Sequence, residues 1–161
     1  MNKQKVCIIG CGDIGFLFDH NRNSDGALSH FKAFRDSEYF DLTAIADSNK
    51  EIRDNIETDY KVDVYENYEK MCIEKKPVVI VIATNDESHF EILKRVTEYK
   101  PLLVFCEKPM TLDSEEAYEI SRLYKEKNIK FQINFTRRFL EEFYDIENII
   151  KEKVIGDIES I

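Results

Sequence analysis

Short apolar runs alternate with longer segments of mixed polarity along the whole chain. The clearest run, Val78 to Ala83, has the sequence VVIVIA and no polar alternation. A strand of this kind is buried on both faces, as in a parallel sheet that is covered by helices. The six strands that the pattern predicts are Val6 to Ile9, Leu42 to Ala46, Val62 to Val64, Val78 to Ala83, Leu102 to Cys106 and Lys130 to Asn134.

The segments between these runs have the spacing of helices. Ile52 and Ile56 lie four residues apart, and Phe139, Phe143 and Ile146 recur at helical spacing, which favours core or domain-interface positions. The predicted helices are Asp13 to Phe18, Leu28 to Ser37, Asn49 to Tyr60, Asn67 to Lys75, His89 to Tyr99, Asp113 to Lys127 and Arg137 to Lys153. Regular alternation of strands and helices predicts an α/β protein with a doubly wound parallel sheet, the Rossmann fold.

A glycine-rich loop joins the first predicted strand to the first helix. Gly10 permits a tight turn, Gly12 lets the backbone approach a phosphate, and Gly15 lets the helix sit close to the strand. The helix N-terminus behind such a loop attracts anions, so we expect it to hold the pyrophosphate of a dinucleotide, with Asp13 and Ile14 in contact as well. A plain turn from strand to helix is the alternative.

An acidic residue, Asp47, follows the second predicted strand. At this place in the dinucleotide fold a carboxylate accepts hydrogen bonds from ribose hydroxyls, and Ser48 lies beside it. It comes 32 residues after Gly15 rather than about 20, which an inserted surface loop, His20 to Gly26, accounts for. Because Asp47 would repel a 2′-phosphate, we expect NAD rather than NADP; capping of the next helix is an alternative or additional role.

Composition narrows the classes of function. The 161 residues fit one domain, and a net charge of -9 without a basic cluster argues against nucleic acid as a partner. The sequence contains neither a signal-like leader nor an apolar run near 18 residues, so we expect a cytoplasmic protein without a membrane partner. Its four cysteines form no Cys-x-x-Cys pair, so we expect buried thiols and no metal site.

Four landmarks resemble one known family, that of glucose-fructose oxidoreductase, inositol dehydrogenase and MocA. The most specific is Glu-Lys-Pro directly after a buried strand, for which a methyltransferase with a similar glycine loop gives no reason. Together the landmarks span nearly the whole chain, in the family's order. They are the glycine loop, Ala83-Thr84-Asn85 with His89, Glu107-Lys108-Pro109 and Arg137-Arg138-Phe139.

The resemblance implies an NAD(P)-dependent oxidoreductase that acts on a sugar, cyclitol or related polyol. Family members are usually about twice as long, with a larger α/β domain behind the Rossmann domain, and Val154 to Ile158 resembles the start of that domain. We therefore expect a dinucleotide-binding domain at 1–136 and a junction helix with the start of a second domain at 137–161. The whole protein would be a homo-oligomer through that domain, and this chain alone would be inactive. The alternative is a stand-alone NAD(H) sensor without turnover.

The resemblance also assigns roles around the Glu-Lys-Pro segment. Lys108 would act in catalysis, by hydrogen bonding to the reacting hydroxyl and stabilising the alkoxide that develops. Glu107 would bind a ribose hydroxyl, and Pro109 would fix the turn after a cis peptide bond. Without the resemblance, a salt bridge between Glu107 and Lys108 is the simpler reading.

The remaining candidates lie at other strand ends. Ala83, Thr84 and Asn85 are expected near the nicotinamide ribose, although the latter two also suit helix caps. His89 would touch the cofactor, cap its helix or serve as a structural residue, and His30 is a weaker candidate. The arginines after the sixth strand would contact substrate or cofactor, or lie in solvent as surface residues. They are Arg137 and Arg138.

Overall fold

Six parallel strands form one sheet in the order β3-β2-β1-β4-β5-β6. The computed structural model describes residues 2–20 and 26–160, so most of the predicted loop His20 to Gly26 lies outside the described residues. The strands are β1 (Gln4–Ile9), β2 (Phe40–Ala46), β3 (Asp63–Tyr65), β4 (Val79–Ile82), β5 (Leu103–Cys106) and β6 (Lys130–Ile133). The helices of the body are α1 (Phe18–His20), α2 (His30–Arg35), α3 (Lys50–Asp59), α4 (Tyr68–Lys75), α5 (His89–Val96) and α6 (Ser114–Glu126).

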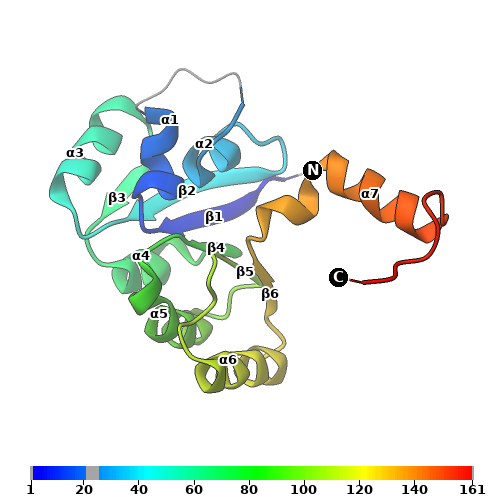
Figure 1. Cartoon of the computed structure of the whole chain (residues 1–161). Coiled ribbons are helices and arrows are strands. Elements are labelled where there is room, and N and C mark those ends of the chain that lie inside the picture. The colour runs from blue at the N-terminus through cyan, green and yellow to red at the C-terminus, as the bar shows by residue number, and fades with distance from the viewer. Residues whose placement is uncertain (1, 21–25, 161) are drawn as a thin grey trace.

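Helices cover both faces of the sheet, with α1, α2 and α3 on one side and α4, α5 and α6 on the other (Figure 1). Alternate residues of β1 enter different cores. Val6 and Ile8 pack in the cluster with Phe16, Phe31 and Ile56. Cys7 and Ile9 pack in the cluster that contains residues of α4, α5 and α6. Burial on both faces explains why the strands lack polar alternation and confirms the predicted doubly wound fold.

The first helix begins with an unusually wide turn. Residues Asp13–Leu17 form a π-helical turn, η1, in which the carbonyl oxygen of Gly12 accepts hydrogen bonds from the backbone N–H groups of Phe16 at 2.8 Å and Leu17 at 3.0 Å. The helical pattern predicted there is therefore right, but its geometry is wider than an α-helix. Other predicted bounds move by one to three residues, and 3₁₀ turns flank α5 at Asp86–Ser88 and Thr97–Tyr99.

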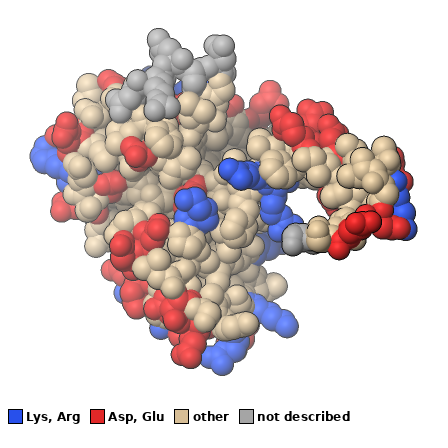
Figure 2. Space-filling model, in the orientation of Figure 1, with Lys and Arg blue, Asp and Glu red and all other residues tan. Residues whose placement is uncertain are grey.

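The C-terminal segment differs from its prediction. One helix was expected from Arg137, whereas the chain forms a 3₁₀ turn, Thr136–Phe139, and a separate helix α7, Glu141–Lys151, because Leu140 between them is extended. No residue of α7 is buried, so Phe143 and Ile146 are not core residues of this chain. The helix extends from the body as an arm, and Lys and Arg side chains gather where it leaves the body (Figure 2).

Among the described residues, no helix has both the length and the apolar character needed to cross a membrane.

Candidate functional site

The carboxyl ends of β1, β2, β4 and β5 surround one cleft of about 840 Å³. From β1 the chain moves outward through β2 to β3 and then returns to the other side of β1 with β4, so the cleft lies where the strand order reverses. Eleven of the predicted site residues line it. They are Gly10, Gly12, Asp13, Ile14, Asp47, Ser48, Ala83, Thr84, Asn85, Glu107 and Lys108.

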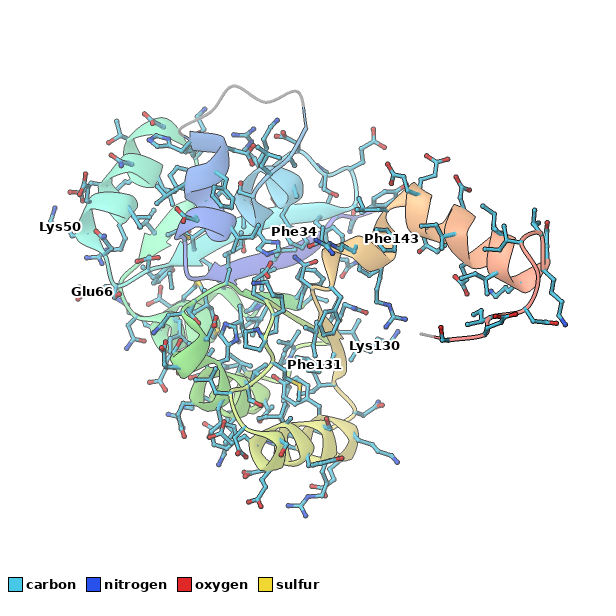
Figure 3. All side chains as sticks on the ribbon, viewed as in Figure 1. Phe34, Lys50, Glu66, Lys130, Phe131 and Phe143 are labelled. Atoms are coloured by element: carbon cyan, nitrogen blue, oxygen red, sulfur yellow. The ribbon has the colours of Figure 1, made fainter. Side chains whose placement is uncertain are left out.

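Sequence reasoning missed a second set of lining residues. Most are apolar residues at strand ends or on neighbouring helices, which sequence patterns assign to the core. Glu66, labelled in Figure 3, directly follows β3, so the rule that ligands bind at strand carboxyl ends offered a signal for it. The missed residues are Ile9, Phe18, Ala46, Ile52, Glu66, Tyr68, Asp86, Ser88, Ile92 and Thr136.

The three glycines of the loop have three different environments. Gly10 has a φ of +88°, and a Cβ there would lie 2.6 Å from the carbonyl group of Ala83. A Cβ on Gly15 would lie 2.4 Å from the carbonyl oxygen of Gly10, so helix and strand pack with no room for a side chain. At Gly12, nothing lies within 4 Å of the Cβ position. The space in front of Gly12 is therefore open, and this part of the cleft fits a bulky anion such as pyrophosphate.

Asp47 is bonded to the glycine loop. Its Oδ2 accepts the backbone N–H of Cys11 at 2.6 Å, and its Oδ1 accepts that of Asn49 at 2.8 Å. Capping of α3 falls instead to Asn49, whose side chain accepts the N–H of Glu51. Arg53 donates to the carbonyl oxygens of Asp47 and Ser48, both at 2.8 Å. The residues that follow β2 are thus tied to the glycine loop that follows β1.

The Thr84-Asn85 segment is held by Ser88. The Ser88 hydroxyl lies 2.7 Å from the hydroxyl of Thr84 and donates to the carbonyl oxygen of Asn85 at 2.8 Å. Asn85 occupies the N-cap position of a 3₁₀ turn, but its side chain makes no capping hydrogen bond and instead donates to Glu87 at 2.9 Å. The alternative that the Asn85 side chain caps a helix is therefore wrong.

His89 does not line the cleft. Its side chain is fully buried, which contradicts a contact with the cofactor, one of the three roles expected for it. Nδ1 donates to the carbonyl oxygen of Pro109 at 2.6 Å, and Nε2 lies 3.2 Å from the carbonyl oxygen of Thr84. The ring therefore ties together the two loops that follow β4 and β5, which is a structural role.

Glu107 is a buried carboxylate at the edge of the cleft. Its partners are His30, Asn134 and the backbone N–H of Lys108. Burial opposes ionisation, but the hydrogen bonds from His30 and Asn134 outweigh it and hold the pKa of Glu107 below its ordinary value. His30, the weaker of the two histidine candidates, thus contacts a residue of the cleft although it does not line the cleft itself.

Lys108 is exposed and lines the cleft. In the part of the chain that the structure describes, its ammonium forms no salt bridge with Glu107, so the expected alternative to a functional role is absent there. The peptide bond between Lys108 and Pro109 is cis, as the resemblance implied, although Pro109 is not a lining residue. Arg137 and Arg138 are exposed and follow Thr136, which does line the cleft.

The charged lining of the cleft is mainly acidic. Lys108 is the one basic side chain among the described residues that line it. Five carboxylates accompany it, from Asp13, Asp47, Glu66, Asp86 and Glu107. An additional phosphate on a ligand would therefore meet unfavourable charge. Among the described residues, no three His, Cys, Asp or Glu side chains are grouped as a metal ion requires.

Comparisons with known proteins agree with this geometry. Over 155 residues the chain is 26% identical to inositol 2-dehydrogenase/D-chiro-inositol 3-dehydrogenase of Lactiplantibacillus plantarum, covering 94% of this chain and 41% of that protein. It is 22% identical to the rhizopine catabolism protein MocA of Rhizobium meliloti, covering 98% of this chain and 45% of that protein. The chain thus spans less than half the length of these relatives.

Solved structures show the same fold. The crystal structure of myo-inositol 2-dehydrogenase from Lactobacillus plantarum superposes with a TM-score of 0.82 at 23% identity, over 98% of this chain and 43% of that one. An oxidoreductase from Agrobacterium radiobacter in complex with NAD+, L-tartaric acid and magnesium gives a TM-score of 0.80 at 17% identity, over 97% and 42%. The model of the oxidoreductase family with an NAD-binding Rossmann fold matches residues 4–135. The chain therefore belongs to the Gfo/Idh/MocA oxidoreductase family, and it is the NAD-binding Rossmann domain of that family that it matches.

Proposed function

We propose that this chain is the cofactor-binding part of an oxidoreductase that transfers a hydride between NAD and a hydroxyl carbon of a sugar, cyclitol or related polyol. The observation that carries the proposal is the single cleft that unites the glycine loop, Asp47 and Lys108 at the carboxyl ends of four strands. The polyol class is supported by the relatives, among which are inositol dehydrogenases.

The residues of the cleft suit the parts of a dinucleotide. The open space at Gly12 and the N-terminus of η1 receive the pyrophosphate. Asp47 and Ser48 bind the ribose of the adenosine half, while Thr84, Asn85 and Glu107 lie at the opposite end, where the nicotinamide ribose belongs. When bound, NAD supplies the hydride acceptor or donor, and the protein supplies binding, orientation and proton handling.

Lys108 has the chemistry for proton handling. Its ammonium is exposed at the cleft, so it is accessible to a substrate hydroxyl. There it hydrogen bonds to the reacting oxygen and stabilises the negative charge that develops as the hydride leaves the carbon. Arg137 and Arg138 contact the substrate from the segment after β6, where they lie exposed beside the cleft-lining Thr136.

A second domain is needed for turnover. The relatives are more than twice as long, and we infer that residues 1–136 form the dinucleotide-binding domain while 137–161 lead into a substrate domain of the whole protein. The exposed apolar side chains of α7 support a packing partner of that kind, through which the whole protein forms homo-oligomers. Four free thiols agree with the cytoplasm as its location.

Two measurements test the proposal. Isothermal titration of the 161-residue chain with NAD+ should show binding, and absorbance of NADH should show turnover of inositols or sugars by the whole protein but none by the chain alone. The reason is that hydride transfer needs the donor carbon held about 3 to 3.5 Å from the nicotinamide, with water excluded. Absence of NAD+ binding would overturn the proposal. Binding without turnover by the whole protein would favour an NAD(H) sensor.

A further inference from the structure

Glu107 is held inside the protein by two side chains from distant parts of the sequence. Nε2 of His30 donates to its Oε1 at 2.7 Å, and Nδ2 of Asn134 donates to the same oxygen at 2.6 Å. His30 belongs to α2, Glu107 follows β5 and Asn134 follows β6. The side chains of His30 and Glu107 are each 9% exposed. The carboxylate is therefore fixed from two sides rather than free to rotate.

The two donors leave the two oxygens of the carboxylate unequal. A carboxylate offers about four acceptor sites, two on each oxygen. Oε1 receives both short hydrogen bonds. Among the described residues, Oε2 receives one long contact, 3.3 Å from the backbone N–H of Lys108. Since Glu107 lines the cleft, Oε2 keeps acceptor capacity for a ligand that enters there.

His30 is itself held in place. Ser29 caps α2 by accepting the N–H of Lys32 at 3.2 Å, and the carboxylate of Asp19 accepts both the N–H and the hydroxyl of Ser29 at 2.6 Å. The His30 ring also packs edge-on against Phe105, with ring centroids 5.5 Å apart. Asp19 thus ties the end of α1 to the start of α2, and the imidazole is presented to Glu107 in one orientation.

We propose that His30 and Asn134 are positioning residues that hold Oε2 of Glu107 as the acceptor for ribose hydroxyls at the nicotinamide end of a bound dinucleotide. The proposal rests on the proposed function, because it concerns the same cleft. Neither side chain needs to touch the ligand. Both restrict rotation of the carboxylate before the ligand binds, so less conformational entropy is lost on binding.

The test compares NAD+ with ADP. ADP ends at the second phosphate and does not reach Glu107, so it reports on the glycine loop and Asp47 alone. Titration calorimetry of His30→Leu and Asn134→Leu should show NAD+ affinity lower by up to about tenfold, the cost of ordering one side chain when a ligand binds, with ADP affinity within twofold of wild type. His30→Gln keeps a donor and should recover part of the loss.

A double-mutant cycle makes the test specific. In a Glu107→Ala background, His30→Leu should have no further effect on NAD+ affinity, because the group that it positions is gone. Equal losses for NAD+ and ADP, or unchanged NAD+ affinity in both single variants, would overturn the proposal. If His30→Leu does not fold, Asn134→Leu decides the question, since Asn134 is only partly buried. Failure of wild-type protein to bind either ligand would overturn the proposed function, and this inference with it.

Discussion

The carboxylate of Asp47 accepts the backbone N–H of Cys11 at 2.6 Å, which joins the end of β2 to the phosphate-binding loop after β1. We therefore expect this one side chain to serve two purposes, to fix the geometry of the loop and to select against a 2′-phosphate. Arg53, the nearest arginine in sequence, does not offset the charge, because it is engaged with two backbone carbonyl groups and pairs with Glu66 at 3.5 Å.

From this we predict tighter binding of NAD+ than of NADP+. Asp47→Asn removes the charge but keeps an oxygen for the loop, so it should narrow the preference about tenfold with a small loss of NAD+ affinity. Asp47→Ala should narrow the preference for NAD+ over NADP+ similarly. It should also lower the affinity for NAD+, because the hydrogen bond from the N–H of Cys11 is lost. Calorimetric titration with both cofactors measures these effects. Asp41→Asn, an exposed position on β2, is the control, and tighter NADP+ binding by wild type would contradict the prediction.

Substitutions at two of the loop glycines should have different effects, one on dinucleotide binding and the other on stability. Gly12→Val is expected to leave a folded protein that binds no dinucleotide, because its side chain meets nothing in the protein and fills the space for the pyrophosphate. Gly15→Ala should instead lower the free energy of unfolding by about 3 kcal/mol, since its Cβ would overlap the carbonyl oxygen of Gly10. Urea unfolding and NAD+ titration of both variants distinguish the two effects. Wild-type affinity in Gly12→Val would refute the assigned role of the loop.

Replacement of Lys108 should affect turnover rather than binding. In the whole protein, Lys108→Ala is expected to lower kcat by a factor on the order of 10² to 10⁴, the range that general acid–base groups supply, with NAD+ affinity nearly unchanged. Lys130→Ala is the matched control, because Lys130, labelled in Figure 3, is also exposed but begins β6, whereas Lys108 follows the carboxyl end of β5. Near-normal kcat in Lys108→Ala would show that Lys108 has no role in catalysis.

The four cysteines predict loss of stability in alkali. Burial raises the pKa of Cys7 to about 11 and those of Cys72 and Cys106 to about 12, and it raises the pKa of Cys11 as well. Above pH 9 the unfolded chain releases these protons while the folded chain keeps them. The free energy of unfolding should therefore fall with rising pH, by as much as about 5.5 kcal/mol per pH unit for four thiols.

Urea unfolding at pH 7.5, 9 and 10 measures this slope. Cys72→Ala should make this slope less steep by the contribution of one thiol, about 1.4 kcal/mol per pH unit, although the variant is less stable overall. All four thiols are at most 1% exposed, so a thiol reagent at pH 8 should label the native protein only as it unfolds. Constant stability up to pH 10, or rapid labelling under native conditions, would contradict the prediction.

The sheet was predictable because the pattern that indicates each strand lies within the sequence of that strand and its neighbours. The strands in the middle of the sheet contain apolar runs that are buried on both faces, and polar residues of the cleft follow them, as at Ile82-Ala83-Thr84 and Cys106-Glu107-Lys108. The spacing of Gly10, Gly12 and Gly15 likewise predicts the turn that joins β1 to η1. These features depend on neighbours in sequence, which a pattern can show.

The parts that escaped prediction depend on distant partners. His30 and Glu107 are 77 positions apart, so nothing near His30 in the sequence indicates its carboxylate partner. The contact of His89 with Pro109 spans 20 positions, so the sequence near His89 left three roles open and could not show that the ring is structural. The break at Leu140 is equally invisible, because the apolar spacing continues across it from Phe139 to Phe143.

The central place of β1 has a consequence for how the protein is made. Residues Val6 to Ile9 pair on one side with β2 and on the other with β4, which leaves the ribosome roughly 70 residues later. At about 5 to 20 residues per second, that interval lasts about 4 to 14 s. During this time the apolar residues of β1 have one unpaired edge, so we expect this strand to be exposed to pairing with other chains during synthesis.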